Sequence, residues 1–416
     1  MNAIALAPDA AKAVRSCVRC GFCTATCPTH ILLGNELDGP RGRIQLMKHM
    51  LETDASPSAS VVEHIDRCLS CLACKTTCPS GVNYMHLVDE ARGHIARHFR
   101  RPLIDRVIRA LLATVLPHPR RFRLTLALAP VARPFAPLFA SVTALRPLAA
   151  MLRLAPTRLP AAQPRPRTEG HQGKVAMLRG CAEPVLAPDI QAAAARLIAR
   201  MGFALVDAPG ERCCGALVQH MGRDSDALVA ARANVDAWDT IDGLEAIVLT
   251  TSGCGTVIKQ YGHMLRHDPA YAIRAARVSA MTRDVSEFVA EQGLPQVTLA
   301  ATSLAVAYHA ACSLQHGQGV RAAPLALLAE AGFAVREIPE GHLCCGSAGT
   351  YNILQPDIAQ RLRDRKLANI ATLAPDVIVA GNIGCLVQLS GTTPTVHLAQ
   401  MLDWATGGPP PRSIAL

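Results

Sequence analysis

The chain has 416 residues, of which 50% are hydrophobic and 18% charged, a length that provides for two or three domains with cores of their own. No run reaches the eighteen uncharged apolar residues of a membrane-spanning helix, since Arg133 and Arg146 interrupt the most apolar region. Residues 1–13 lack the basic start and apolar core of a secretory signal, so the 16 cysteines are expected to bind metal in the cytoplasm rather than form disulfides.

The first 100 residues contain one cysteine motif twice. The spacing C-x₂-C-x₂-C-x₃-C-P, a bacterial iron–sulfur signature, occurs at Cys17, Cys20, Cys23 and Cys27, and again at Cys68, Cys71, Cys74 and Cys78. In two-cluster ferredoxins the cysteine before proline ligates the other cluster. One [4Fe–4S] centre is therefore assigned to Cys17, Cys20, Cys23 and Cys78, and the second to Cys68, Cys71, Cys74 and Cys27. Zinc ribbons use paired C-x₂-C knuckles instead, so zinc is the weaker alternative.

Amphipathic helices are predicted after each motif, over residues 34–51 and 85–99. They favour a helical ferredoxin-type domain over residues 1–100 rather than a small β ferredoxin. Arg41 and Arg43 follow the first motif closely. Their charge either raises the potential of a cluster or is solvated at a helix start.

A basic connector is predicted over residues 101–170. Between Arg100 and Arg158 lie eleven arginines and one acidic residue, Asp105, so this segment carries the whole net charge of +10. Arginine mixed with apolar residues at helical intervals is typical of contact with an anionic membrane surface or an acidic partner, and equally of a solvated connector packed on its own domains. Nucleic acid is disfavoured because Phe122, Phe135 and Phe139 are the only aromatic residues of this segment that could stack on bases, and no recognised nucleic-acid-binding module is present. Residues 160–173 form the predicted linker.

The other eight cysteines form an internal repeat with an offset of 131 residues. The first copy holds Cys181, Cys213, Cys214 and Cys254, and the second holds Cys312, Cys344, Cys345 and Cys385. Strands are predicted at 174–179, 203–206 and 246–249, and at 304–308, 333–335 and 376–379, with helices between them such as 190–201 and 323–331. This alternation predicts two α/β modules with parallel sheets, over residues 171–300 and 301–416, and an α+β multidomain protein as a whole. The cysteines fall at the carboxyl ends of strands, where such sheets bind ligands.

Three segments carry a family resemblance: residues 39–48 (GPRGRIQLMK), 116–123 (LPHPRRFR) and 342–351 (HLCCGSAGTY). Together with the motif pair and the two Cys-Cys-Gly modules, they make the chain resemble the iron–sulfur subunits of glycolate oxidase (glycolate dehydrogenase). The resemblance implies an oxidoreductase complex in which a separate FAD subunit oxidises glycolate to glyoxylate. This chain would pass the electrons toward a quinone or membrane acceptor, from the cytoplasm or the inner face of the cytoplasmic membrane. Alternatives are the equivalent subunit of a lactate or glycerol-3-phosphate dehydrogenase or of a heterodisulfide-reductase-like complex.

No G-x-G-x-x-G fingerprint occurs, so neither a nucleotide or flavin site nor a catalytic residue is assigned to this chain. Related modules often end in C-x-x-C, whose first position here is Thr251 or Asn382. The eight module cysteines therefore either hold one or two further clusters or are packed thiols. Direct thiol–disulfide chemistry is disfavoured at adjacent cysteines, and a scaffold with purely structural clusters is a further alternative. Three histidines near these sites are replacement ligands, proton carriers or ordinary polar residues: His309, His316 and His342.

Overall fold

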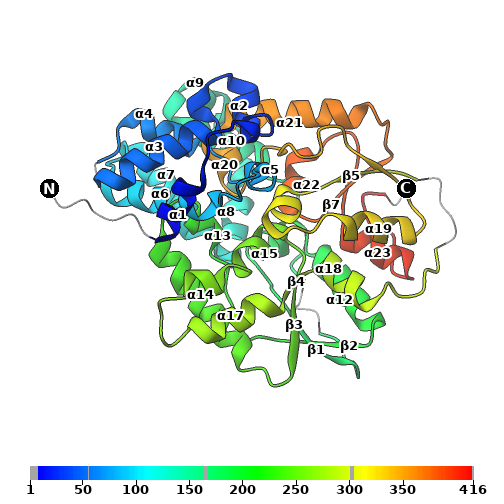
Figure 1. The fold of residues 1–416 in the computed structure, drawn as a ribbon. Coiled ribbons are helices and arrows are strands. Elements are labelled where there is room, and N and C mark those ends of the chain that lie inside the picture. The colour runs from blue at the N-terminus through cyan, green and yellow to red at the C-terminus, as the bar shows by residue number, and fades with distance from the viewer. Residues whose placement is uncertain (1–7, 55, 164–166, 300–303, 415–416) are drawn as a thin grey trace.

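The computed structural model describes residues 8–54, 56–163, 167–299 and 304–414, which form a helical N-terminal part, a helical connector and two α/β modules (Figure 1). The start of the predicted first domain (residues 1–7), part of the predicted linker (164–166) and the predicted module boundary (300–301) lie outside the described residues. The α+β multidomain class predicted from the sequence is confirmed.

The N-terminal part is helical throughout its described residues. It comprises α1 (Pro8–Ser16), η1 (Phe22–Thr24), α2 (Pro28–Leu33), η2 (Glu36–Asp38), α3 (Pro40–Thr53), α4 (Ala59–Asp66), α5 (Ala73–Thr77) and α6 (Tyr84–His98). The helix predicted from residue 34 begins later because Asn35 caps η2 and the chain turns before Pro40. A Cβ on Gly42 would lie 2.2 Å from the carbonyl oxygen of Glu36, so this glycine lets α3 pack on η2. The core around Met47 and Leu87 holds the cysteine loops in place.

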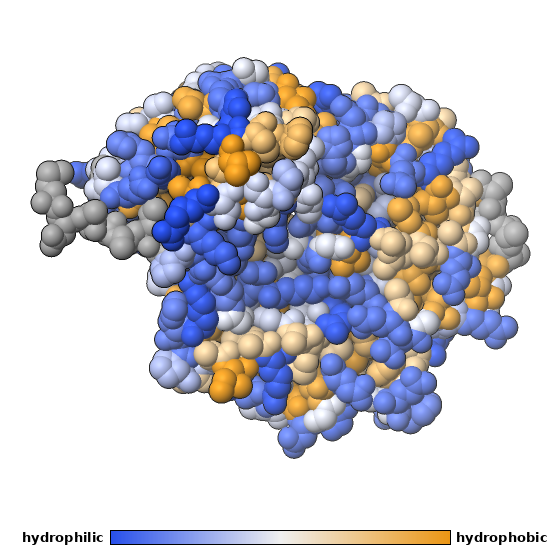
Figure 2. Space-filling model, viewed as in Figure 1, coloured by the Kyte–Doolittle hydropathy of each residue, from blue (hydrophilic) through white to orange (hydrophobic). Residues whose placement is uncertain are grey.

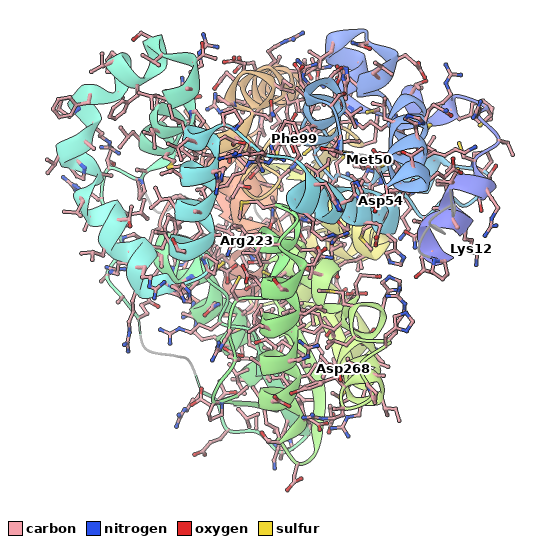
Figure 3. The ribbon with its side chains drawn as sticks, turned by 90° about the vertical axis from the view of Figure 1, so that its left-hand side faces the viewer. Lys12, Met50, Asp54, Phe99, Arg223 and Asp268 are labelled. Carbon is pink, nitrogen blue, oxygen red and sulfur yellow. The ribbon has the colours of Figure 1, made fainter. Side chains whose placement is uncertain are left out.

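The connector forms the outer edge of the molecule, at the left of Figure 3 in aquamarine. It comprises α7 (Leu103–Val115), α8 (Pro119–Ala132), η3 (Arg133–Phe135), α9 (Ala136–Ser141), η4 (Thr143–Leu145) and α10 (Arg146–Leu154). The sequence predicts no membrane span. Among the described residues, however, one helical run, Pro119–Ser141, is long and apolar enough for a span by length and composition, and only 6% of its most apolar 18-residue window is buried.

Each module contains a four-stranded parallel sheet. Module 1 has the order β2-β1-β3-β4 and module 2 has the order β6-β5-β7-β8. The strands are β1 (Gly173–Met177), β2 (Phe203–Val206), β3 (Leu244–Leu249), β4 (Thr282–Asp284), β5 (Ala305–His309), β6 (Ala334–Glu337), β7 (Val377–Ala380) and β8 (Thr395–His397). The sequence predicts six of these strands. It misses β4 and β8 because three residues are too few to show the two-residue alternation of a strand.

Helices cover the sheets and include the predicted pair that ends before Gly202 and Gly332, whose φ values of 83° and 87° favour glycine. Module 1 has α11 (Glu183–Leu186), α12 (Asp189–Arg200), α13 (Ala216–Gln219), α14 (Asp224–Asp239), α15 (Ser252–Ile258), α16 (Tyr261–Met264), α17 (Ala272–Met281) and α18 (Val285–Gln292). Module 2 has η5 (Ser313–Gln318), α19 (Ala322–Glu330), α20 (Tyr351–Leu354), α21 (Pro356–Ala371), α22 (Ile383–Leu389) and α23 (Leu398–Ala405).

One continuous core joins the modules. It includes Val175 and Phe288 of module 1 and Tyr308 and Met401 of module 2. Asp403 on α23, only 1% exposed, accepts hydrogen bonds from Arg196 and Arg200 on α12. The cysteine-bearing ends of the two sheets also meet, since the hydroxyl oxygens of Ser252 and Ser313 lie 2.7 Å apart. The modules therefore hold their cysteines in a fixed relation.

Candidate iron–sulfur centres

The first cysteine group lies at the surface. Its cavity is lined by Cys17, Cys20, Cys23, Cys74 and Cys78. Gly21, with φ of 85°, lets the chain turn tightly between Cys20 and Cys23. Burial, followed by the charge of Cys17, raises the pKa of the Cys23 thiol to about 11. Near this cavity, Val18 and Phe22 are 68% and 63% exposed. Figure 2 shows several hydrophobic residues at the surface of the N-terminal helices, at the upper left.

The second cysteine group is buried. Its cavity is lined by Cys27, Cys68, Cys71 and Cys74, so Cys74 borders both cavities. Burial raises the pKa of Cys71 and Cys74 well above the usual thiol value. Burial would also raise the pKa of Cys68, but the charges of Arg43 and Arg92 outweigh it and leave that pKa below the usual value. Two cations thus favour negative charge at this group.

The two arginines after the first motif differ in environment. Arg43 is 1% exposed, its Nε donates to the carbonyl oxygen of His64 at 2.7 Å, and its Nη1 lies 3.9 Å from Cys27 Sγ. The side chain of Arg41 is 41% exposed and pairs with Glu36 at 2.6 Å. The solvated alternative is therefore wrong for Arg43, whose guanidinium is buried beside the second group.

Both cavities suit an iron–sulfur cluster. Each is lined by at least four thiols, and among the described residues neither is lined by a carboxylate or an imidazole. Thiolates are the soft ligands that iron–sulfur clusters require, and binding to iron deprotonates a thiol whose pKa is otherwise high.

The four cysteines of module 1 converge at one end of its sheet. Contacts between thiols run in the order Cys181, Cys213, Cys214 and Cys254. The hydroxyl of Tyr261 donates to the carbonyl oxygen of Cys214 at 2.8 Å. Thr251, at the position of the missing cysteine, donates to the buried carboxylate of Glu183 at 2.8 Å. In module 1, the residue at the position of the missing cysteine therefore forms a hydrogen bond and does not supply a thiol.

The four cysteines of module 2 converge in the same way and lie against the second ferredoxin-type group. Cys71 lines one cavity together with Cys312, Cys344, Cys345 and Cys385. Cys345 Sγ and Cys385 Sγ are 3.6 Å apart, and Asn382 Nδ2 lies 3.5 Å from Cys385 Sγ. The sequence does not predict which module adjoins the ferredoxin-type domain, and the structure places module 2 there.

A buried lysine next to the thiols of module 2 is missed by the sequence analysis. Lys366, the eleventh residue of α21, is 2% exposed and donates to the carbonyl oxygen of Glu340 at 2.7 Å. Burial lowers its pKa, while the charges of the module 2 cysteines raise it. The eleventh residue of α14 in module 1 is neutral Asn234. Aligning the paired helices would have revealed this difference between the repeats.

His316 is an ordinary polar residue of the interface. Its Nδ1 lies 2.8 Å from the hydroxyl oxygen of Thr76 on α5, and its Nε2 lies 3.2 Å from the carbonyl oxygen of His342. Both ring nitrogens therefore have partners away from the thiols. His309 is different, because neither of its buried ring nitrogens has a hydrogen-bond partner among the residues that the structure describes.

Comparison with known proteins agrees with this division of the chain. Residues 13–82 match the family described as a 4Fe-4S dicluster domain, and residues 175–259 and 306–390 each match the cysteine-rich domain. The glycolate oxidase iron-sulfur subunit of Escherichia coli (strain K12) is 42% identical over 408 residues, which cover 97% of this chain and 96% of that protein. The chain belongs to the family of glycolate oxidase iron–sulfur subunits.

Other relatives of this glycolate oxidase subunit family differ in coverage. A probable glycolate oxidase iron-sulfur subunit of Bacillus subtilis (strain 168) is 32% identical and covers 94% of each chain. Lactate utilization protein A of Bacillus licheniformis is 26% identical over 55% of this chain and 99% of its own length. A crystal structure of a hypothetical protein from Helicobacter pylori shares the fold, with a TM-score of 0.53, 12% identity, and coverage of 90% of this chain and 69% of that one.

The family assignment confirms several predictions. The resemblance drawn from the sequence motifs is correct, and the chain is an iron–sulfur subunit of an oxidoreductase complex. Its cofactors are [4Fe–4S] clusters bound by the dicluster domain.

Proposed function

We propose that this chain conducts electrons from an FAD subunit, which oxidises glycolate to glyoxylate, toward a quinone-type acceptor. The observation that carries this proposal is the continuous series of cysteine groups from the exposed Cys20, through the shared wall at Cys74, to Cys71 and Cys312 of module 2. The names of the relatives at 42% and 32% identity support glycolate as the substrate of the complex.

We assign the ligands of the two clusters as the sequence predicts. Cys17, Cys20, Cys23 and Cys78 hold one, and Cys68, Cys71, Cys74 and Cys27 hold the other. The shared cavities of these sets support the assignment. When bound, the clusters supply one-electron carriers. The protein contributes fixed thiolates, apolar walls and the charges of Arg43 and Arg92, which favour the reduced and more negative state of the second cluster.

The exposed apolar residues beside the first group suit the docking of the electron donor. Val18 and Phe22 are more than half exposed; Val18 lines the cavity of Cys17 and Cys20, and Phe22 directly precedes Cys23 in the chain. An FAD subunit that covers them would bring its flavin near the surface cluster and would bury apolar area on association.

We also propose that the module cysteines bind metal. Lys366 is buried, and the thiols of Cys312, Cys344 and Cys345 raise its pKa more than the carboxylate of Glu340, which is already paired with Arg365. A buried cation without negative charge nearby is costly. Thiolates held by a metal supply that charge, whereas neutral packed thiols do not.

The function is tested with the FAD subunits and a quinone analogue. With glycolate as the donor, we expect quinone reduction when this chain is present and loss of that reduction when the chain is omitted, while direct dye reduction at the flavin continues. Lactate and glycerol 3-phosphate serve as alternative donors in the same assay. Quinone reduction that is unchanged without this chain would contradict the proposal.

The basic connector supports a peripheral contact with an anionic membrane. Ten of the fifteen exposed large hydrophobic residues in the described part of the chain lie between residues 103 and 142. On α8, the exposed Arg120 and Arg121 form no ion pair with a described residue, whereas Arg123 donates to the carbonyl oxygen of Pro160. Arg101 and Arg109, in contrast, both form ion pairs with Asp66, so their charges are neutralised within the protein. Exposed apolar side chains next to arginines that have no ion pair within the described part of the chain match a surface of anionic lipid headgroups and acyl chains.

We expect the triple variant Leu124→Gln, Leu128→Gln, Val131→Gln to bind vesicles containing phosphatidylglycerol more than about tenfold more weakly than wild type, because burial of each such side chain contributes roughly 1.5–3 kcal/mol. Vesicle flotation measures the binding, with phosphatidylcholine vesicles for comparison. Val229→Gln with Ile273→Gln is the control, since these apolar residues are also more than half exposed but lie on module 1. Equal binding by the triple variant and the control would rule out this contact.

A further inference from the structure

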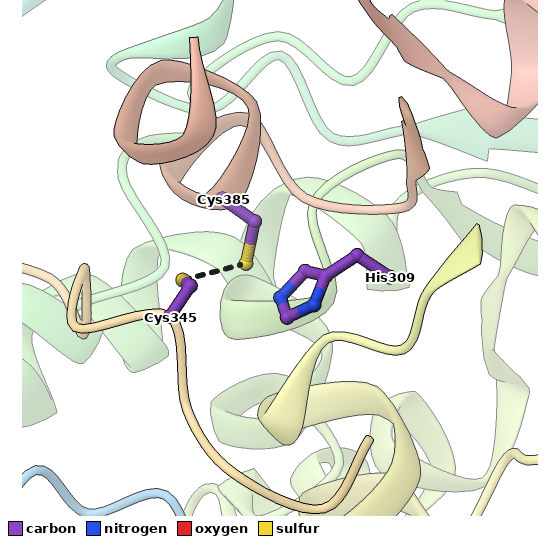
Figure 4. A group of neighbouring side chains, drawn as sticks. All are labelled: His309, Cys345 and Cys385. Atoms are coloured by element: carbon purple, nitrogen blue, oxygen red, sulfur yellow. Dashed lines mark hydrogen bonds between the residues drawn. The ribbon is translucent and has the colours of Figure 1, made fainter. Parts of the chain in front are cut away.

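His309 is placed at the thiols of module 2 by the end of a strand. It is the last residue of β5, three residues before Cys312, and is 1% exposed. One ring nitrogen of His309, Cys345 Sγ and Cys385 Sγ all lie within 4.8 Å of one another. Figure 4 shows the imidazole of His309 at the end of β5, facing Cys385 on α22 and Cys345 in the loop between β6 and α20. Three elements of the module thus bring one nitrogen and two sulfur donors together.

Within the described part of the chain, the imidazole has no other polar partner. Neither Nδ1 nor Nε2 of His309 forms a hydrogen bond with a described residue, although the side chain is only 1% exposed. A buried polar group without a partner is destabilising and rare in native proteins.

The repeat shows that the fold does not require a histidine here. With the offset of 131 residues, the position of His309 corresponds to Leu178 in module 1, which is 4% exposed and packs in the core. The same position therefore accepts an aliphatic side chain in an equivalent sheet. Module 2 in addition has the buried charge of Lys366 as the eleventh residue of α21, where the eleventh residue of the paired helix α14 in module 1 is Asn234.

We propose that His309 is a metal ligand in module 2 and gives this module an iron–sulfur site with mixed nitrogen and thiolate ligands, whereas module 1 binds through thiolates alone. The thiolates of module 2 are those of Cys312, Cys344, Cys345 and Cys385. Asn382, whose side-chain nitrogen faces Cys385 Sγ, donates to that sulfur and does not act as a ligand. This inference rests on the proposed metal binding by the module cysteines.

Nitrogen coordination is tested by pulsed EPR of the reduced holoprotein purified anaerobically, with natural and ¹⁵N-labelled histidine. The ferredoxin-type clusters have thiolate ligands only, so a strong histidine nitrogen coupling reports on module 2. We expect this coupling in wild type, its loss in His309→Leu, and its retention in His316→Leu, a buried histidine of the same module with partners of its own. His309→Leu should bind the metal of module 2 more than about tenfold more weakly, because even partners of metal ligands contribute 10–100-fold.

Two further variants keep the test decisive. His309→Cys supplies a thiolate, so we expect it to retain the metal and lose the nitrogen coupling, which separates ligand loss from misfolding. Cys385→Ala shows by iron and sulfide analysis whether module 2 holds iron. If Cys385→Ala loses iron but wild type shows no nitrogen coupling, then module 2 binds iron and only the role of His309 is overturned. Unchanged iron in Cys385→Ala, or zinc at this site, would overturn the module 2 iron site, while the quinone assay would still test electron transfer independently.

Discussion

Cys78→Ala is expected to lose the cluster of Cys17, Cys20 and Cys23, although Cys78 belongs to the second sequence motif. Cys78 lines the cavity of the first group and not that of the second. Iron per chain should fall by about four, the content of one cubane, and quinone reduction from glycolate should be lost because the surface group no longer accepts electrons.

The spectrum of the remaining cluster decides the assignment. Iron and sulfide analysis with EPR after dithionite reduction should make Cys78→Ala match Cys20→Ala, which removes a member of the first group. Cys27→Ala should in turn match Cys71→Ala, a member of the second group. If Cys78→Ala instead matched Cys71→Ala, each motif would hold its own cluster and the exchange of the fourth ligand would be wrong.

Arg43→Met is expected to lower the stability of the N-terminal domain by about 3 kcal/mol, a typical cost for removing one partner of a buried ion pair. Arg43 lies 3.6 Å from the carboxylate of Asp38, and both side chains are 1% exposed. Its Nη2 also donates to Thr29 at 3.0 Å. Asp38 keeps contacts with His64 and Arg67 but loses its fully buried cation. Urea titration followed by cluster absorbance measures the loss.

The same substitution should make the potential of the second cluster more negative, because a buried positive charge beside Cys27 and Cys68 favours the reduced state. Redox titration with EPR detection measures this shift. Arg41→Met is the matched control, since its side chain is exposed and paired with Glu36. A potential for Arg43→Met equal to that of Arg41→Met would show that burial of the cation does not tune the cluster.

Local patterns explain why so much of the fold could be predicted. The helices α3 and α6, the paired helices before Gly202 and Gly332, and six strands follow from periodicity and glycine stops within short segments. The short strands β4 and β8 carry no such pattern. The sequence also does not reveal whether an arginine is exposed, since Arg41 and Arg43 are two residues apart, yet the first is exposed and the second is buried.

The sequence by itself determined the type of chemistry, because cysteine spacing is a covalent property of the chain and fixes which thiols share a loop. It also determined the two modules, since the offset of 131 residues repeats at four cysteines. Only the tertiary structure decided which module meets the ferredoxin-type domain, which side chains surround the thiols, and that His309 faces Cys345 and Cys385. Such contacts join residues far apart in the chain, and packing of whole elements, which no local pattern records, sets their distances.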